Sequence, residues 1–283
     1  MSKFFDETQK ARQWAPQVPQ TGRIDVVSVI DAIKQNESVA TDVVEAGPAT
    51  RMEIETQKPV NALIKTVQSD NPLPAPAVEA YGSLRTRVMK LQAAKGIRSL
   101  MLTSSVPSEG KTLTALNLAV SFAKLHNLRI LLVDGDLRSR GLTRLLQIPE
   151  GPGLSDFLGR KVTADKAVLP TEHENLFVLG AGTQNGLPSE LFAGPLWPEC
   201  IAWASQSYGI VIVDAPPMHL LSDAELISAG CDGVLIVVKA LSTPREIAQK
   251  CVSRLDKRKL IGIVFNGLPS TSDSNYGYYG TSS

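Results

Sequence analysis

Short runs of almost wholly apolar residues recur from residue 100 onwards, and stretches with helical periodicity lie between several of them. The runs occupy residues 100–102, 129–133, 176–179, 210–213, 234–238 and 260–265. In one intervening stretch, one helical face carries Leu113, Leu116, Val120 and Ala123. Strands without polar alternation are typical of parallel sheets, because helices cover both faces of such sheets. The sequence therefore predicts an α/β fold, with a doubly wound parallel sheet flanked by helices.

Two further signals place helices around these strands. An apolar stripe from Leu84 to Leu91 follows helical spacing and predicts a helix before the first strand. Ser222 and Glu225 have the spacing of a capping box, which predicts another helix start. Both helices are of the kind that cover a parallel sheet.

Residues 1–77 differ in composition from the rest, because they contain seven prolines and few long apolar runs. We expect a flexible, mostly irregular N-terminal extension with short helices at most, such as Val26–Ile33, that is mobile or docks on a partner. The stretch Asp70–Ala77 is typical of an extended linker. The main domain is expected at 78–268, and a low-complexity tail of Tyr, Gly and Ser at 269–283.

A phosphate-binding loop is predicted at Ser105–Thr112, between an apolar run and a helix. Backbone N–H groups of the loop, at Ser108, Glu109 and Gly110, would point at phosphate oxygens. Lys111 would reach the β- and γ-phosphates, and Thr112 would place its hydroxyl on Mg²⁺. Ser105 stands where the common pattern has its first glycine.

Carboxylates follow two of the apolar runs at the point where each run ends. Asp134 and Asp136 come after one run, and Asp214 comes after another. In a parallel sheet these strand ends lie at the same edge as the phosphate loop. Carboxylate oxygens there can hold Mg²⁺ directly or through water, since this ion prefers hard oxygen ligands.

Together, the segments TSSVPSEGKT, ILLVDGDLR and IVIVDAPP resemble the Walker A, A′ and B motifs of the bacterial tyrosine kinases, the autokinases of capsular and exopolysaccharide synthesis. The resemblance runs from about Val78 to the C-terminus. It includes GLSDFL, LPSELF, SDAELI and NGLP, which begin at residues 153, 187, 222 and 266. Partitioning and cell-division ATPases usually carry an extra lysine near the first glycine of the loop. Residues 99–110 contain no lysine, which points away from those ATPases.

The resemblance implies a role for each of these polar residues. Lys111 and Thr112 would bind ATP and Mg²⁺. The implied metal ligands are Thr112, Asp136 and Asp214. The implied catalytic set is Lys111, Asp134 and Asp136, in which Asp134 is the candidate base for a tyrosine hydroxyl; the assignment between the two aspartates stays open. Arg138 would neutralise phosphate charge at the nucleotide, or is a solvated arginine after a strand.

The tail supplies candidate acceptors. Three of the five tyrosines of the chain, Tyr276, Tyr278 and Tyr279, lie in its last eight residues among Gly and Ser. They resemble the tyrosine cluster that the family phosphorylates between neighbouring protomers. Each phosphate would add about −1.5 to −2 charge, which is enough to loosen an interface by repulsion.

One segment departs from the family pattern. The oligomerisation helix of the family reads Glu-x-x-Arg-x-x-Arg, and here Glu79 and Arg85 match while Gly82 replaces the middle arginine. Spacing of three residues places these positions on one helical face. Homo-oligomer assembly therefore lacks one expected ion pair, or uses Arg87 instead.

Composition excludes several classes of protein. The 29 basic and 28 acidic residues give a net charge of +1, which argues against nucleic-acid binding. No apolar run approaches the roughly 20 residues that span a bilayer. We therefore expect a cytoplasmic protein, and the resemblance to the kinase family implies that it is peripheral at the inner face of the cell membrane through a partner. By resemblance it has two partners, a membrane-anchored activator of the polysaccharide chain-length (co-polymerase) type and a cognate tyrosine phosphatase.

Two other functions remain open at this point. The first is a P-loop ATPase switch, of the kind that positions cargo and phosphorylates nothing. The second is a nucleotide-sensing scaffold without kinase activity. ATP hydrolysis without tyrosine phosphate would favour the switch, and nucleotide binding alone would favour the scaffold.

Overall fold

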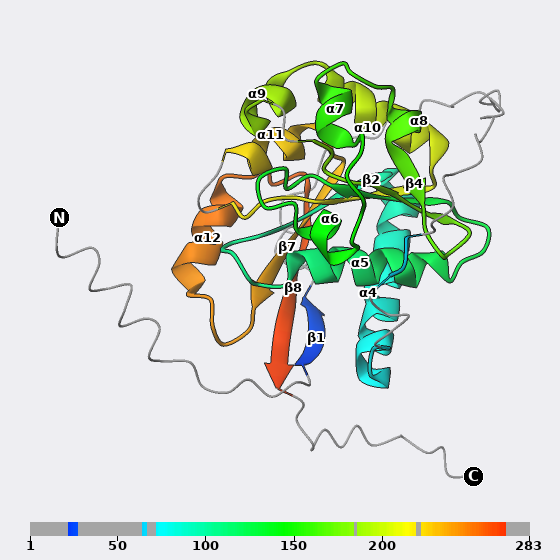
Figure 1. Cartoon of the computed structure of the whole chain (residues 1–283). Coiled ribbons are helices and arrows are strands. Elements are labelled where there is room, and N and C mark those ends of the chain that lie inside the picture. Colours follow the sequence, from blue (N-terminus) through cyan, green and yellow to red (C-terminus); the bar gives the residue numbers. More distant parts are fainter. Residues whose placement is uncertain (1–21, 28–63, 67–71, 184–185, 219–221, 270–283) are drawn as a thin grey trace, which may run out of the picture.

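The computed structural model describes residues 22–27, 64–66, 72–183, 186–218 and 222–269 (Figure 1). The strands are β1 (Gly22–Val27), β2 (Ser99–Ser104), β3 (Ile130–Asp134), β4 (Val168–Pro170), β5 (Leu176–Leu179), β6 (Ile210–Asp214), β7 (Gly233–Lys239) and β8 (Leu260–Pro269). The helices are α4 (Ala75–Lys95), α5 (Lys111–Ala123), α6 (Gly141–Leu145), α7 (Leu154–Leu158), α8 (Ala164–Ala167), α9 (Pro188–Ala193), α10 (Leu196–Ser207), α11 (Asp223–Gly230) and α12 (Arg245–Ser253).

All eight strands form one sheet, in the order β1-β8-β7-β2-β6-β3-β5-β4. The six strands from β8 to β5 are parallel, and each of them coincides with one of the apolar runs. The two edge strands, β1 and β4, run antiparallel to their neighbours. The predicted parallel sheet is therefore confirmed, with two antiparallel edges added.

Helices cover both faces of the sheet, as the apolar strands require. Along β2, Leu100 and Leu102 pack into the core beneath α4 and α5, whereas Met101 packs into the core on the other face. That second core contains Trp197 from α10 and Ile227 from α11. Figure 1 shows α4 and α5 on the side of the sheet away from α9, α10 and α11. Because helices bury these parallel strands on both faces, the sheet is a rigid support for the loops that follow the carboxyl ends of the strands.

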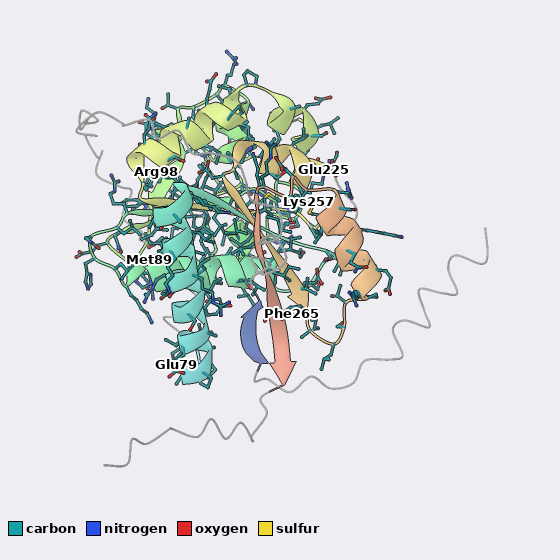
Figure 2. All side chains as sticks on the ribbon, turned by 180° about the vertical axis from the view of Figure 1, so that it is seen from behind. Glu79, Met89, Arg98, Glu225, Lys257 and Phe265 are labelled. Atoms are coloured by element: carbon teal, nitrogen blue, oxygen red, sulfur yellow. The ribbon has the colours of Figure 1, made fainter. Side chains whose placement is uncertain are left out.

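Helix α4 begins inside the proline-rich stretch, so the extended linker does not reach Ala77 as expected. Pro74 caps the helix and Pro76 lies in its first turn, where a missing N–H costs nothing. The predicted stripe is confirmed, because Leu84 and Val88 are buried in the core. Figure 2 shows Glu79 and Met89 along this helix, and both side chains are exposed.

Strand β1 comes from the N-terminal extension, where the sequence suggested a short helix at Val26–Ile33. That suggestion is wrong for Val26 and Val27, which pair with Val264 and Ile263 of β8; residues 28–33 lie outside the described part of the chain. Edge strands held mainly by backbone pairing carry a weak sequence signal. A second N-terminal contact is the bridge between Ile64 and Thr171.

Helix α11 begins at Asp223, as predicted, but without the expected capping box. Ser222 makes no capping hydrogen bond through its side chain. Glu225 instead pairs with Arg254, whose Nε lies 2.5 Å from its Oε1. Within the described residues, no helix combines the length and the apolar character needed to cross a membrane.

Candidate active site

The predicted phosphate loop lies between β2 and α5. Two of its residues adopt the left-handed region, Ser108 with a φ of 64° and Gly110 with a φ of 92°. A Cβ at Gly110 would lie 2.0 Å from Nδ2 of Asn266, which donates a hydrogen bond to the carbonyl of Glu109 at 2.9 Å. Glycine is therefore favoured here by its backbone conformation, and a Cβ would displace the Asn266 side chain from this hydrogen bond.

The side chain of Glu109 secures this loop from inside. It is 2 % exposed. Its oxygens accept hydrogen bonds from the N–H of Val106 at 2.8 Å, from the N–H of Lys239 at 3.2 Å and from the hydroxyl of Thr243. The loop is thus tied to the end of β7. Glu109 was predicted only as part of the phosphate cradle, and the sequence carried no signal for this second role.

Lys111 stands between two carboxylates at the carboxyl edge of the sheet. Its Nζ lies 3.0 Å from Oδ2 of Asp136 and 3.3 Å from Oδ1 of Asp214. The hydroxyl of Thr112 donates to Oδ2 of Asp214 at 2.7 Å. The structure therefore brings together four of the predicted site residues, drawn from the phosphate loop, from the turn after β3 and from the end of β6.

Charge pairing sets the protonation states of this group. Burial alone would lower the pKa of Lys111, but the charges of Asp214 and Asp136 outweigh burial and raise it. Burial alone would raise the pKa of Asp136, whereas Lys111 and the hydrogen bonds from Ser139 bring it below the ordinary value. An ammonium group and a carboxylate thus coexist in a site with little water.

Asp134 is fully buried, as is Asp214. Its Oδ2 accepts hydrogen bonds from both the N–H and the hydroxyl of Thr143, each at 2.7 Å. Its Oδ1 is buried without a hydrogen-bond partner. Burial, reinforced by the charge of Asp214, raises the pKa of Asp134 to about 7. A carboxyl group with this pKa exchanges a proton readily near neutral pH. Nothing in the sequence marked Thr143 as its partner.

Arg138 lies beside the site, and its charge is already compensated. Its Nε lies 2.7 Å from Oδ2 of Asp223, the first residue of α11, and its side chain is 41 % exposed. The pairing with Asp223 raises the pKa of Arg138. Its predicted contact with nucleotide phosphate stays a prediction. The predicted acceptors Tyr276, Tyr278 and Tyr279 lie outside the described residues.

The donor set suits the nucleotide and metal that the motifs imply. The hydroxyl of Thr112 and the carboxylates of Asp136 and Asp214 are the hard oxygen ligands that Mg²⁺ prefers. Lys111 already places a positive charge among them. Among the described residues, no three His, Cys, Asp or Glu side chains converge on one metal position, so the hydroxyl and phosphate oxygens would complete the shell.

Comparison with known proteins places the chain in a family. No protein-family model matches it. It is 34% identical over 205 residues to the tyrosine-protein kinase YwqD of Bacillus subtilis, covering 72% of this chain and 86% of that protein. It is 31% identical over 209 residues to the tyrosine-protein kinase CpsD of Streptococcus pneumoniae, covering 72% and 91%.

Solved structures agree with the sequence relatives. The kinase domain of the Escherichia coli tyrosine kinase ETK superposes with a TM-score of 0.67 at 28% identity, covering 81% of this chain and 89% of that one. The cell-division ATPase MinD of Pyrococcus furiosus superposes less well, with a TM-score of 0.51 at 25% identity over 59% of this chain and 69% of that one. The fold is that of a nucleotide-binding P-loop protein, and the chain belongs to the bacterial tyrosine-protein kinase family.

Proposed function

We propose that this kinase transfers the γ-phosphate of ATP to tyrosines of its own C-terminal tail, Tyr276, Tyr278 and Tyr279. The observation that carries the proposal is the position of Lys111, held between Asp136 and Asp214 with Thr112 beside it. Phosphoryl transfer needs mostly positioning and charge neutralisation, and this group supplies both kinds of contact.

In the proposed reaction the loop Ser108–Thr112 binds the phosphates through backbone N–H groups. Lys111 leaves its carboxylate partners for the β- and γ-phosphates. The oxygens of Asp136 and Asp214 and the hydroxyl of Thr112 would then hold Mg²⁺, which would supply neutralisation of the charge on the phosphate oxygens. The tyrosine oxygen forms a bond to the γ-phosphorus while the bond from that phosphorus to the ADP oxygen breaks.

We propose that Asp134 accepts the proton of the tyrosine hydroxyl during the transfer. Its pKa of about 7 and its unpartnered Oδ1 support it as the base, whereas Asp136, with its lowered pKa and its contact to Lys111, is better suited to the metal. Asp134 has no exposed surface, so the assignment requires the turn after β3 to open toward the acceptor.

We propose two partners and a role for the modification. A membrane-anchored protein of the polysaccharide chain-length type would activate the kinase and hold it at the inner face of the cell membrane, where the kinase would regulate capsular or exopolysaccharide synthesis. A cognate phosphatase would reset the tail. The resemblance of the motifs to capsular autokinases supports this placement. The domain bounds that go with it are 78–268 for the kinase and 269–283 for the tail.

The test is mass spectrometry of the intact protein and of its peptides after incubation with Mg-ATP. Three chains are compared: the unaltered chain, Lys111→Ala, and the chain with all three tail tyrosines changed to Phe. A parallel set contains the cytoplasmic segment of the candidate activator. We expect phosphate on the tail tyrosines of the unaltered chain and none in Lys111→Ala.

The outcomes separate the kinase from its alternatives. ATP hydrolysis without tyrosine phosphate in any sample would identify a P-loop ATPase switch. Nucleotide binding with neither activity would identify a scaffold. Phosphate on tyrosines elsewhere in the chain, retained in the Phe variant, would keep the kinase and reject the tail as its substrate.

A further inference from the structure

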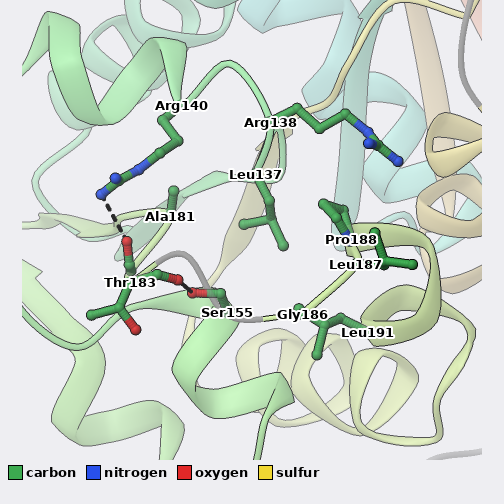
Figure 3. Close-up of a pocket in the computed structure, with 11 residues that line it drawn as sticks. Leu137, Arg138, Arg140, Ser155, Ala181, Thr183, Gly186, Leu187, Pro188 and Leu191 are labelled. Carbon is green, nitrogen blue, oxygen red and sulfur yellow. Dashed lines mark hydrogen bonds between the residues drawn. The ribbon is translucent and has the colours of Figure 1, made fainter.

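A pocket of about 280 Å³ lies beside the turn that follows β3 (Figure 3). Its lining comes from three parts of the sequence: Leu137–Arg140 after β3, Ser155 of α7, and residues 181–183 and 186–191 between β5 and the first turns of α9. The volume is near the lower end of the ~300–1,000 Å³ typical of small-ligand sites. It suits one side chain with its flanking backbone rather than a whole nucleotide.

The pocket unites two sequence stretches that have no role so far. Ser155 belongs to GLSDFL, while Leu187, Pro188 and Leu191 belong to LPSELF. Hydrogen bonds hold the walls in place. Asp156 accepts from the N–H of Gly153 at 3.0 Å and from that of Thr183 at 2.8 Å. Such a network fixes the shape of the pocket before any ligand enters.

The pocket adjoins the proposed phosphoryl-transfer site. Leu137 follows Asp136 directly, and the N–H of Arg140 donates to the carbonyl of Asp136 at 2.6 Å. A Cβ at Gly141 would lie 3.3 Å from Oγ1 of Thr112. The turn 136–141 therefore lies against Thr112 and also lines the pocket, so we expect a residue held in the pocket to lie close to the bound phosphates.

The lining combines an apolar surface with one unpaired positive charge. Leu137, Leu187, Pro188 and Leu191 supply the apolar surface, and Figure 3 shows Leu137 directed between Ser155 and Leu191. Arg140 donates from Nη2 to the carbonyl of Gly182 at 2.7 Å, while its Nε is buried without a partner. Within the described residues no carboxylate lies at ion-pair distance from Arg140, in contrast to Arg138 and Asp223.

We infer that this pocket binds the acceptor tyrosine of the C-terminal tail, through the part of the tail at residues 270–283. The inference rests on the proposed function and names the acceptor site. The tail is complementary to the lining, because it contains three aromatic rings, one acidic residue (Asp273) and no lysine or arginine. A ring packs on the leucines and proline, and Arg140 binds the negative charge of the segment or of its phosphate. Apolar contact with charge complementarity selects tyrosines in a segment that carries an acidic residue and no basic one.

The test uses the full chain with Tyr276, Tyr278 and Tyr279 changed to Ala, so that its own tail cannot compete. A labelled synthetic peptide with the sequence of residues 270–283 serves as ligand and substrate. Its affinity is measured by fluorescence anisotropy with Mg-ADP, and its phosphorylation by steady-state kinetics with Mg-ATP. Leu187→Ser and Arg140→Gln are introduced into this parent. Leu187 is 55 % exposed, so its change leaves the core intact.

Leu241→Ser is the matched control, since Leu241 is 89 % exposed and lies outside the pocket. We expect both pocket variants to raise the Kd and the KM for the peptide by about fivefold or more, as loss of a well-packed apolar or charged contact does. The KM for ATP should stay within about twofold of the parent in all three variants. Arg140→Lys should recover part of the affinity, because it keeps the charge.

Failure of this inference is distinguishable from failure of the proposed function. A parent that binds the peptide through the pocket without phosphorylating it would reject the tail kinase activity and keep the pocket. A parent that phosphorylates the peptide with the same KM in Leu187→Ser and Arg140→Gln as in Leu241→Ser would overturn the pocket alone. A parent that neither binds nor phosphorylates the peptide would overturn both.

Discussion

Asp134 at the end of β3 lies in register with Asp214 at the end of β6, on adjacent parallel strands. Both side chains have no exposed surface. Two neighbouring carboxylates in a dry site cannot both hold a full negative charge at low cost. Lys111 contacts Asp214 directly, while Thr143 is the hydrogen-bond partner of Asp134. The pair thus divides into Asp214, which faces the cation of Lys111, and Asp134, whose carboxyl group loses its proton only near pH 7.

This division predicts a pH-dependent stability. Aspartate titrates near 3.9 in an unfolded chain and Asp134 at about 7 in the folded one, so the folded state holds more protons between these values. The free energy of unfolding should therefore fall as the pH rises from 4 to 7. Asp134→Asn removes this titrating group. The free energy of unfolding of the variant, relative to that of the parent, should therefore rise by up to about 4 kcal/mol between pH 4 and pH 8. Urea denaturation with EDTA at several pH values measures the difference. A pH-independent difference would refute the assignment.

Removal of the ammonium group of Lys111 should destabilise the protein as well as inactivate it. Lys111→Met leaves Asp136 and buried Asp214 without their cation, and loss of one partner of such a pair typically costs about 3–5 kcal/mol. Lys124→Met, at the exposed end of α5, is the control. Chemical denaturation and nucleotide titration measure both effects. Equal stability of the two variants would show that the carboxylates do not depend on Lys111.

The contacts of the Glu109 carboxylate with the rest of the protein should control nucleotide affinity by holding the phosphate loop in shape. In Glu109→Gln an amide N–H₂ must face backbone N–H donors that the carboxylate now satisfies. We expect a loss of about 1–3 kcal/mol of stability and weaker ATP binding. Glu246→Gln, exposed on α12, should change neither. Isothermal titration with ATP checks the expectation, and unaltered affinity in Glu109→Gln would contradict it.

Gly82 offers a substitution that the fold accepts freely. A Cβ there would meet no atom within 4 Å, and arginine is favoured over glycine in a helix by up to about 1 kcal/mol. Gly82→Arg should therefore raise the melting temperature by a few degrees, and light scattering will report whether it also raises the oligomeric state. A lower melting temperature would mean that Gly82 serves a close contact.

The sequence predicted the centre of the sheet well and its edges poorly. Strands buried on both faces, such as β3 and β6, are marked by continuous apolar runs. Strand β1 is defined by its pairing with β8, and β4 is only three residues long, so neither produces such a run. A local sequence pattern shows which side chains a segment buries, but it does not show that a segment becomes a strand by pairing its backbone with a neighbouring strand.

The same distinction holds within the site. Lys111, Thr112, Asp136 and Asp214 were predicted because each occupies a fixed place after a strand, and the structure brings them together. Their supporting contacts were missed. Thr143, Asp223 and the carboxylate of Glu109 act through partners 9, 85 and 130 residues away in sequence, and a single sequence contains no sign of such pairs.

The register of β1 links the two ends of the chain. Leu268 and Pro269 pair with Arg23 and Gly22, whereas the pairing of β8 with β7 ends at Asn266. Leu268 and Pro269, at the junction with the tail, are thus held in the sheet by the N-terminal strand alone. A protein that captured or displaced β1 would lengthen the tether of the tyrosines by these residues, so the reach of the tail is set by the opposite end of the polypeptide.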